Sequence, residues 1–188
     1  MPGRTADLVL ADGGAIHVRP IVPDDADGIL DLHARMSDRT RYYRFFGAYP
    51  RIPARDLRRF VTVDHHDREA LVALADGRIA AVGRYERLAG PGTDAEVAFV
   101  VADAHQRRGI ATDLLRRLAE AAREAGVVRF VAEVLPGNSP MLRVFSGAGF
   151  TISHEYADGV IHVSFPITGP DPVPGSDAGG GPDTSTGG

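Results

Sequence analysis

Short stretches of alternating or continuous apolar residues recur along the chain, and this pattern is typical of β-strands. Many of the stretches are rich in β-branched and aromatic residues, which suit a pleated, half-buried surface. The pattern predicts strands at residues 15–21, 70–75, 78–88, 94–101, 129–135, 151–157 and 160–166. Asp76-Gly77 and Asp158-Gly159 are two-residue hairpin signals, so they predict antiparallel pairing of the strands on either side.

Apolar positions at helical spacing, with start and stop signals beside them, predict helices among these strands. The helices are expected to begin near Pro23, Ser37, Pro53, Gly109 and Ser139, and Gly126 is the expected end of the helix that follows Gly109. Helices that flank a largely antiparallel sheet of about seven strands make an α/β (α+β) fold.

One residue of the 94–101 strand does not fit a buried surface. Glu96 shares a strand face with Ala98 and Val100, because side chains two residues apart point the same way. A carboxylate on such a face costs stability unless something uses it. We therefore expect Glu96 to be a desolvated functional carboxylate. An acid that is hydrogen-bonded to a neighbouring strand is the structural alternative.

The segment after this strand predicts an anion-binding site. A long amphipathic helix begins near Gly109, and none of residues 105–108 is a favoured Ser, Thr, Asp or Asn cap. The first amide groups of the helix therefore lack an obvious acceptor, and an anion can fill that role. Gly109 and Ala111 are small enough for a phosphate to approach, and Arg107 and Arg108 add positive charge.

Other interpretations of this loop compete with a pyrophosphate site. Neither the G-x-G-x-x-G fingerprint nor the G-x-x-x-x-G-K-S/T phosphate loop stands between the strand and the helix. On residues 106–111 alone, an ordinary strand-to-helix turn with solvated arginines is favoured. The acid-bearing strand directly upstream reverses that preference.

Strand and loop together resemble the GNAT acetyl-CoA-dependent N-acetyltransferases, whose signature Q/R-x-x-G-x-G/A opens a helix after an acid-bearing strand. Here the signature reads Gln106-x-x-Gly109-x-Ala111. The resemblance continues through Asn138 and Gly149-Phe150 and loosely covers residues 15–166. Within the family, the strings RYYRFFG, VDHHDREALVAL, AEVAFVV and RFVAEVLPGNSPMLRVF are most similar to the acetyltransferase domain of the bacterial protein-lysine acetyltransferases called Pat.

The resemblance implies the GNAT fold, a mixed, largely antiparallel twisted sheet flanked by helices, with a splayed gap beside the Glu96 strand. It implies that the backbone at Phe99, Val100 and Val101 pairs with the pantetheine arm of acetyl-CoA. The other implied cofactor contacts are Gln106, Arg107, Arg108, Gly109, Ile110, Ala111, Thr112, Asn138 and Phe145. Asn138 has a simpler alternative, which is only to begin the helix at Ser139.

The resemblance also implies the chemistry. Glu96 would take a proton from the acceptor amine, directly or through water, and the amine would attack the thioester in a ternary complex without a covalent intermediate. Many family members carry a tyrosine at the position of Phe145, where it protonates the leaving thiolate. Phe145 has no phenolic proton. We therefore expect the proton for the leaving thiolate to come from solvent or from the relay that carries the proton away from the amine.

The acceptor is expected to be the side-chain amine of a lysine in a protein, for example an acyl-CoA synthetase. The alternatives are a small amine or antibiotic as acceptor, and an acyl-CoA-binding module without enzyme activity. Residues 35–59 hold eight arginines against Asp38 and Asp56. This segment is either a solvated helical face, which is commoner, or a surface that contacts an acidic partner or the extra phosphate of the cofactor.

Composition and charge exclude several other classes of protein and of site. The 188 residues are 44% hydrophobic and 24% charged with a net charge of −4, so we expect one globular domain that does not bind nucleic acid. Cysteine is absent, which excludes disulfides and a cysteine nucleophile, and all 21 cationic side chains are arginine. His65-His66-Asp67 lacks a third ligand at helical spacing, so no metal is expected.

The predicted organisation is an N-terminal lead at residues 1–14, the acetyltransferase domain at residues 15–167 and a disordered Gly/Pro/Asp-rich tail at residues 168–188. We find no apolar stretch of signal-peptide or membrane-spanning length, and we expect a cytoplasmic monomer or homodimer. Pat-type proteins usually join this domain to a regulatory domain. Control by such a domain within these 188 residues is not expected.

Overall fold

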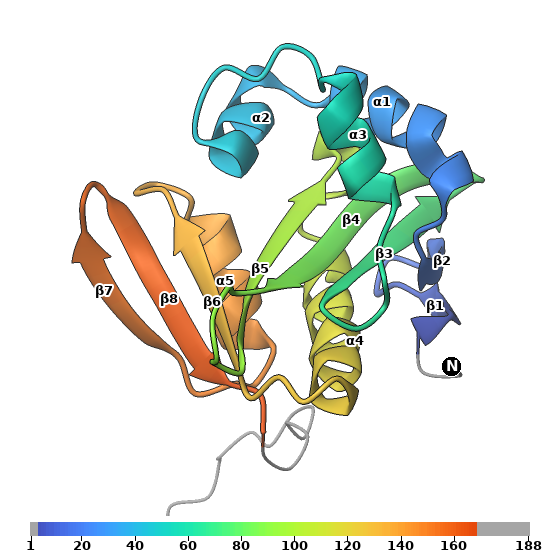
Figure 1. Cartoon of the computed structure of the whole chain (residues 1–188). Helices are drawn as coiled ribbons and strands as arrows, with labels where there is room; N and C mark the ends of the chain where they lie inside the picture. Colours follow the sequence, from blue (N-terminus) through green and yellow to red (C-terminus); the bar gives the residue numbers. More distant parts are fainter. Residues whose placement is uncertain (1–3, 169–188) are drawn as a thin grey trace, which may run out of the picture.

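The structure is a computed structural model that describes residues 4–168, and one mixed β-sheet runs through this part of the chain (Figure 1). Its strands are β1 (Ala6–Val9), β2 (Ala15–Pro20), β3 (Arg68–Ala75), β4 (Arg78–Arg87), β5 (Asp94–Val101), β6 (Arg129–Val134), β7 (Ser153–Ala157) and β8 (Val160–Pro166). The helices are α1 (Ala26–Arg35), α2 (Asp38–Phe45), α3 (Ala54–Val61), α4 (Ile110–Glu124) and α5 (Ser139–Gly147), with 3-10 turns η2 (Pro23–Asp25) and η3 (Asp103–His105).

The strand order is β1-β2-β3-β4-β5-β6-β8-β7, and the eight strands pair antiparallel except for β5 with β6. The predicted strands and helices form with bounds within a few residues of those expected. Strand β1 is the exception, since the sequence pattern indicates no strand before residue 15. It has only four residues, and Val9 at its end is 83% exposed, so it lacks a recognisable apolar alternation.

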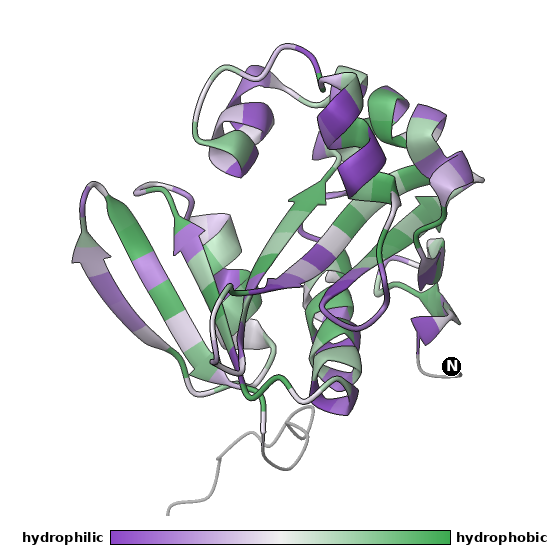
Figure 2. Ribbon diagram, viewed as in Figure 1, coloured by the Kyte–Doolittle hydropathy of each residue, from purple (hydrophilic) through white to green (hydrophobic). Residues whose placement is uncertain are grey.

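Helices cover both faces of the sheet. On one face, α4 and α5 pack on the strands through a core that includes Leu114, Leu118 and Phe145. On the other face, α1 and α3 contribute a second core that includes Leu32 and Val61. Figure 2 shows the same division, with hydrophobic residues along the central strands and a hydrophilic outer side on α3.

Helix ends follow the local sequence. Ser37 caps α2, because its hydroxyl accepts a hydrogen bond from the Thr40 N–H at 3.2 Å. Gly126 ends α4 in the left-handed conformation (φ +79°), as its position predicts. In contrast, α4 begins after Gly109 (φ +83°) without any side-chain cap. The chain therefore leaves the N-terminal amide groups of α4 without a side-chain acceptor, as expected from residues 105–108.

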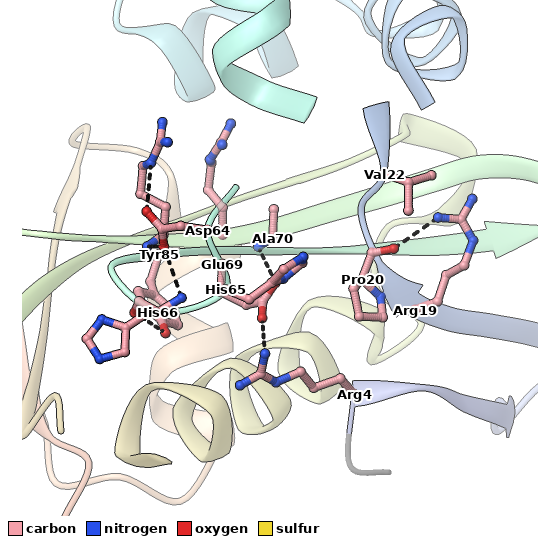
Figure 3. A network of polar contacts seen from close by, with 12 residues as sticks. Arg4, Arg19, Pro20, Val22, Asp64, His65, His66, Glu69, Ala70 and Tyr85 are labelled. Atoms are coloured by element: carbon pink, nitrogen blue, oxygen red, sulfur yellow. Dashed lines mark hydrogen bonds and ion pairs between the residues drawn. The ribbon is translucent and has the colours of Figure 1, made fainter. Parts of the chain in front are cut away.

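A buried ion pair attaches the N-terminal segment to the sheet (Figure 3). Glu69 of β3 has a fully buried carboxylate that accepts from Arg4 Nη1 at 2.5 Å and from the Ala70 N–H at 3.0 Å. His65 Nδ1 lies 2.9 Å from the same carboxylate. Arg4 also reaches Glu124 of α4 at 3.2 Å, so a residue of the predicted N-terminal lead connects β3 with α4.

Candidate active site

Strands β5 and β6 diverge after a short parallel pairing. Asp94, Ala95 and Glu96 are in register with β6, and no later residue of β5 is paired with it. Figure 1 shows the two strands separating toward the end of β5. The cleft between them is lined by residues of α2, β5, β6 and α5. This is the splayed gap that was expected beside the Glu96 strand.

The main chain of β5 presents an unpaired edge to this cleft. Alternate residues of a strand direct their N–H and C=O groups to opposite neighbours. Asp94 and Ala102 both hydrogen-bond toward β4, at 3.0 and 2.8 Å, and the register of β4 with β5 has no shift between them. The main-chain groups of Phe99 and Val101 therefore face the cleft, whereas those of Val100 face β4.

The loop after β5 is fixed by Gln106. Its side-chain amide donates to the Val101 carbonyl at 3.1 Å and to Thr40 Oγ1 at 3.2 Å, which joins the loop to the end of β5 and to α2. Asp103 in the same loop accepts from the Ser37 N–H and hydroxyl at 2.9 and 2.7 Å. The loop and the start of α2 are thus held as one unit beside the cleft.

The start of α4 is open on its outer side. A Cβ atom built on Gly109 would meet no heavy atom within 4 Å, so the positive φ, not crowding, requires glycine here. The side chains of Ile110 and Ala111 are 2% and 7% exposed and pack into the core. Ile110, Ala111 and Thr112 therefore offer their backbone N–H groups, and the helix dipole favours an anion in front of them.

The two arginines of the loop differ. Arg107 is exposed and in the left-handed conformation (φ +61°), and no hydrogen bond or ion pair of its side chain is found within residues 4–168. Arg108 donates from Nε to Asp12 Oδ2 at 2.6 Å and from Nη2 to Asp12 Oδ1 at 3.0 Å. This hydrogen bond from Arg108 lowers the pKa of Asp12 to about 2. The Arg108 guanidinium is turned toward the β1–β2 turn, so its phosphate contact stays a prediction.

Glu96 lies on the face of β5 opposite α4, and its side chain is exposed in the cleft. No hydrogen bond to Glu96 is found among the described residues, so the alternative of a structural acid bonded to a neighbouring strand is not supported. Contrary to the prediction from the sequence, the Glu96 carboxylate is also not desolvated, because β6 diverges here and leaves it open to solvent. Glu96 is therefore accessible to a molecule that enters the cleft.

Asn138 and Phe145 line the opposite wall of the cleft. Asn138 caps α5, since its side chain accepts from the Met141 N–H at 3.4 Å, and it is 8% exposed. Phe145 is 1% exposed and packs edge-on against Phe99 with ring centroids 6.3 Å apart. The helix-starting role of Asn138 is thus present, and both residues lie where a cofactor in the cleft would pass.

The cleft also contains residues that the sequence pattern did not identify as site residues. Arg44 and Tyr43 of α2 and Glu133 of β6 line it. The Tyr43 hydroxyl donates to the Gly137 carbonyl at 3.2 Å, which joins α2 to the loop before α5. Arg44 belongs to the basic segment at residues 35–59, but charge alone could not show which of its arginines turns inward.

The His65-His66-Asp67 loop does not reach the cleft. His65 bonds to Glu69 on the far side of the sheet, and His66 Nδ1 lies 2.9 Å from Asp67. Within residues 4–168, no three His, Asp or Glu side chains are arranged to hold a metal ion, and no helix is long and apolar enough to cross a membrane.

An open strand edge, an uncapped helix start and an accessible acid are brought together by β5 and the loop that follows it, an arrangement that suits a phosphate-bearing carrier. Residues 33–150 match the model of the acetyltransferase (GNAT) family, which is more than half of the chain. The chain belongs to this family of acetyltransferases.

Particular relatives are consistent with the predicted resemblance to Pat. Acetyltransferase Pat of Mycolicibacterium smegmatis is 33% identical over 165 residues, which are 86% of this chain and 49% of that protein. The chain thus spans about half the length of that relative. Acetyltransferase PA5475 of Pseudomonas aeruginosa is 29% identical over 159 residues, 81% of this chain and 85% of that protein.

Among solved structures, the GNAT domain of S. lividans PAT shares 45% sequence identity with a TM-score of 0.80. The similarity covers 86% of this chain and 96% of that domain. Together with the family match, it confirms the predicted α/β fold and the resemblance to Pat.

Proposed function

We propose that this chain acetylates the side-chain amine of lysine residues in a protein, by direct attack of the amine on acetyl-CoA in a ternary complex. One observation carries the proposal: the unpaired edge of β5 ends at the uncapped start of α4, and Glu96 lies on the same strand. Similarity to Pat and to the GNAT domain of S. lividans PAT supports a protein substrate.

Acetyl-CoA fits the residues that are present. The backbone N–H groups at Gly109, Ile110, Ala111 and Thr112, with the charge of Arg107, suit its diphosphate. The N–H and C=O groups of β5 that face the cleft suit the amide groups of its pantetheine arm, because an extended chain can add to an open strand edge. When bound, acetyl-CoA supplies the activated acetyl group.

Glu96 acts as the general base in this proposal. A lysine amine has a pKa of about 10.4 and is mostly charged near neutrality, so a proton must leave before it can attack. The exposed Glu96 carboxylate can accept this proton directly or through a water molecule. Backbone N–H groups of β5 can stabilise negative charge on the carbonyl oxygen. Phe145 cannot protonate the thiolate, so solvent or the proton relay does.

Substitution of Glu96 tests the enzymatic role. Glu96→Gln keeps the shape of the side chain, so acetyl-CoA should bind as before while turnover at pH 7.5 falls at least about tenfold. The loss of turnover in Glu96→Gln should become smaller as the assay pH approaches the pKa of the amine. Unchanged turnover would remove Glu96 as the base.

Glu86 provides a matched control. It lies directly across from Glu96 on β4 and forms an ion pair with Arg59. Glu86→Gln should leave turnover within about twofold, because a surface ion pair contributes little. An equal loss in both variants would indicate a general charge effect rather than a base.

The acceptor is tested by incubation with labelled acetyl-CoA. One panel contains proteins such as acyl-CoA synthetases, and a second contains polyamines and aminoglycosides. Label on protein lysines supports the proposal, and label on small amines alone supports the alternative of a small-molecule acetyltransferase. Binding of acetyl-CoA with no transfer to either panel would favour a module without enzyme activity.

A further inference from the structure

A smaller pocket opens beside the cleft, between the sheet and helices α1 to α3. Val82, Ala98 and Val100 form its sheet side, and its other walls are mostly apolar. Two guanidinium groups, those of Arg44 on α2 and Arg84 on β4, also line it. The pocket is therefore mostly apolar, and its polar side chains are these two arginines and His33, whose Nε2 lies 2.8 Å from the Tyr49 carbonyl.

Neither guanidinium forms a close ion pair within residues 4–168, although Glu96 acts on Arg44 and Glu86 on Arg84 from a longer range. No carboxylate lies within 4.0 Å of Arg44 or Arg84 among the described residues, and Glu86, the next acid along β4, pairs with Arg59. Arg44 and Arg84 instead stack on aromatic rings, at 5.0 and 4.9 Å from the ring centroids. Arg84 also donates to the Phe60 carbonyl at 3.3 Å.

Two other arginines of this chain, one buried and one partly buried, are neutralised. Arg4 pairs with Glu69 at 2.5 Å, and Arg19 pairs with Asp25 at 2.7 Å. A buried charge without a partner is costly, and proteins usually pair it. A bound anion would supply the ion pair that Arg44 and Arg84 lack in this pocket.

The electrostatics agree with this geometry. Burial, followed by the like charge of Arg44, lowers the pKa of Arg84 to about 10. Burial also lowers the pKa of Arg44, although the Glu96 carboxylate opposes this shift. Both side chains remain cations at neutral pH, and they repel each other. An anion between them would bind to both.

The pocket adjoins the proposed base. Arg84 lies directly across from Ala98, and Glu96 is two residues from Ala98 on the same strand face. Arg44, Phe45 and Ala98 line both the pocket and the cleft. A group bound at the two arginines would thus be a near neighbour of an amine at Glu96.

We propose that Arg44 and Arg84 form a subsite for a carboxylate of the acceptor, which positions the amine at Glu96. Two sources share this chemistry, an acidic side chain next to the target lysine in a protein and the α-carboxylate of a small amino-acid acceptor. The inference rests on the proposed function, because it concerns the acceptor of the same reaction. It predicts selectivity for acceptors that carry both an amine and a carboxylate.

Paired acceptors measure this selectivity. The first pair is a single-lysine peptide with Glu beside the lysine and the same peptide with Gln. The second pair is Nα-acetyl-lysine and its methylamide. In at least one pair, kcat/KM should be about tenfold higher for the acceptor that carries the carboxylate, because the contact is charge-assisted. The pair that shows this preference identifies the source of the carboxylate. No preference in either pair would overturn the inference.

Substitutions of the two arginines test whether they cause the preference for a carboxylate. Arg44→Met and Arg84→Met should each bring the ratio within a pair close to one, whereas Arg84→Lys should retain part of it. Arg59→Met is the control, since Arg59 is a more exposed arginine that already pairs with Glu86, and it should keep the full ratio. A preference that survives both methionine substitutions would overturn the inference.

A binding readout separates this inference from the proposed function. N-acetylglutamate, which has no amine to acetylate, is titrated into the protein loaded with coenzyme A. The side-chain Nε–H resonances of Arg44 and Arg84 should shift and saturate, even if no lysine substrate is turned over. Resonances that do not move would refute the subsite, while transfer to no amine would refute only the proposed function.

Discussion

Removing the charge of Glu69 should destabilise the fold without touching the cleft. In Glu69→Gln the side chain keeps its size and can still accept from the Ala70 N–H. Arg4, whose side chain is 7% exposed, then loses its buried partner and keeps only the exposed Glu124 at 3.2 Å. Breaking one side of a buried pair costs about 3–5 kcal/mol, and the remaining contact to Glu124 favours the lower end, about 3 kcal/mol.

The loss is measured by urea unfolding and by thermal melting. For a chain of this size, about 3 kcal/mol lowers Tm by roughly 6–12 °C. Turnover at 25 °C should stay unchanged, because neither Arg4 nor Glu69 lines the cleft. Glu120→Gln, a change at an exposed position on α4, is the control and should alter stability by less than about 0.5 kcal/mol.

A double-mutant cycle tests whether the pair itself is responsible. Arg4→Met also breaks the pair, but Arg4→Met with Glu69→Gln leaves no buried charge at the site. The double variant should therefore lose less than the sum of the single variants, by about 2 kcal/mol. A loss below about 1 kcal/mol in Glu69→Gln, or strict additivity, would show that the N-terminal segment is not held by this pair.

Two further predictions concern acid stability and self-modification. Hydrogen bonds from Arg19 lower the pKa of Asp25, so its stabilising contribution is complete above the ordinary aspartate pKa of about 3.9 and is lost as the pH falls through the lower folded value. Asp25→Asn should cost about 2 kcal/mol at pH 7 after allowance for the partly exposed Arg19, and urea unfolding should show the difference shrinking below pH 4; a constant difference would be inconsistent with this pair. Because the chain has no lysine, its intact mass after incubation with acetyl-CoA should gain at most one acetyl group, at the N-terminal amine, and a longer series of acetyl groups would argue against amine-only chemistry.

Much of the fold could be predicted because it depends on local signals. The alternation of residues 94–101, the Asp76-Gly77 hairpin and the glycine at each end of α4 are each sufficient to place an element. Strand β1 could not be predicted, since its four residues gain stability from pairing with β2 and from Arg4 reaching Glu69, a contact across 65 residues.

The site was predictable in outline and not in detail. The strand, loop and helix around Glu96 are contiguous in sequence, so their order already suggests a cleft. The exposure of Glu96 depends on where β6 diverges, and the orientation of Arg108 depends on Asp12, 96 residues away. The main-chain groups of Phe99 and Val101 face the cleft and those of Val100 face β4, and this alternation depends on the pairing of β5 with β4.

Calorimetric titration with coenzyme A tests the central claim, that the start of α4 binds the diphosphate of the cofactor. Gly109 and Gly126 stand at the two ends of α4 with φ of +83° and +79°, and neither would place a new Cβ within 4 Å of another atom. Alanine at either position therefore carries a similar backbone strain of about 1–2 kcal/mol. Only Gly109→Ala should weaken coenzyme A binding, at least about tenfold, while Gly126→Ala binds within about twofold of the wild type. No heat of binding in the wild type, or equal affinity in all three proteins, would contradict the account.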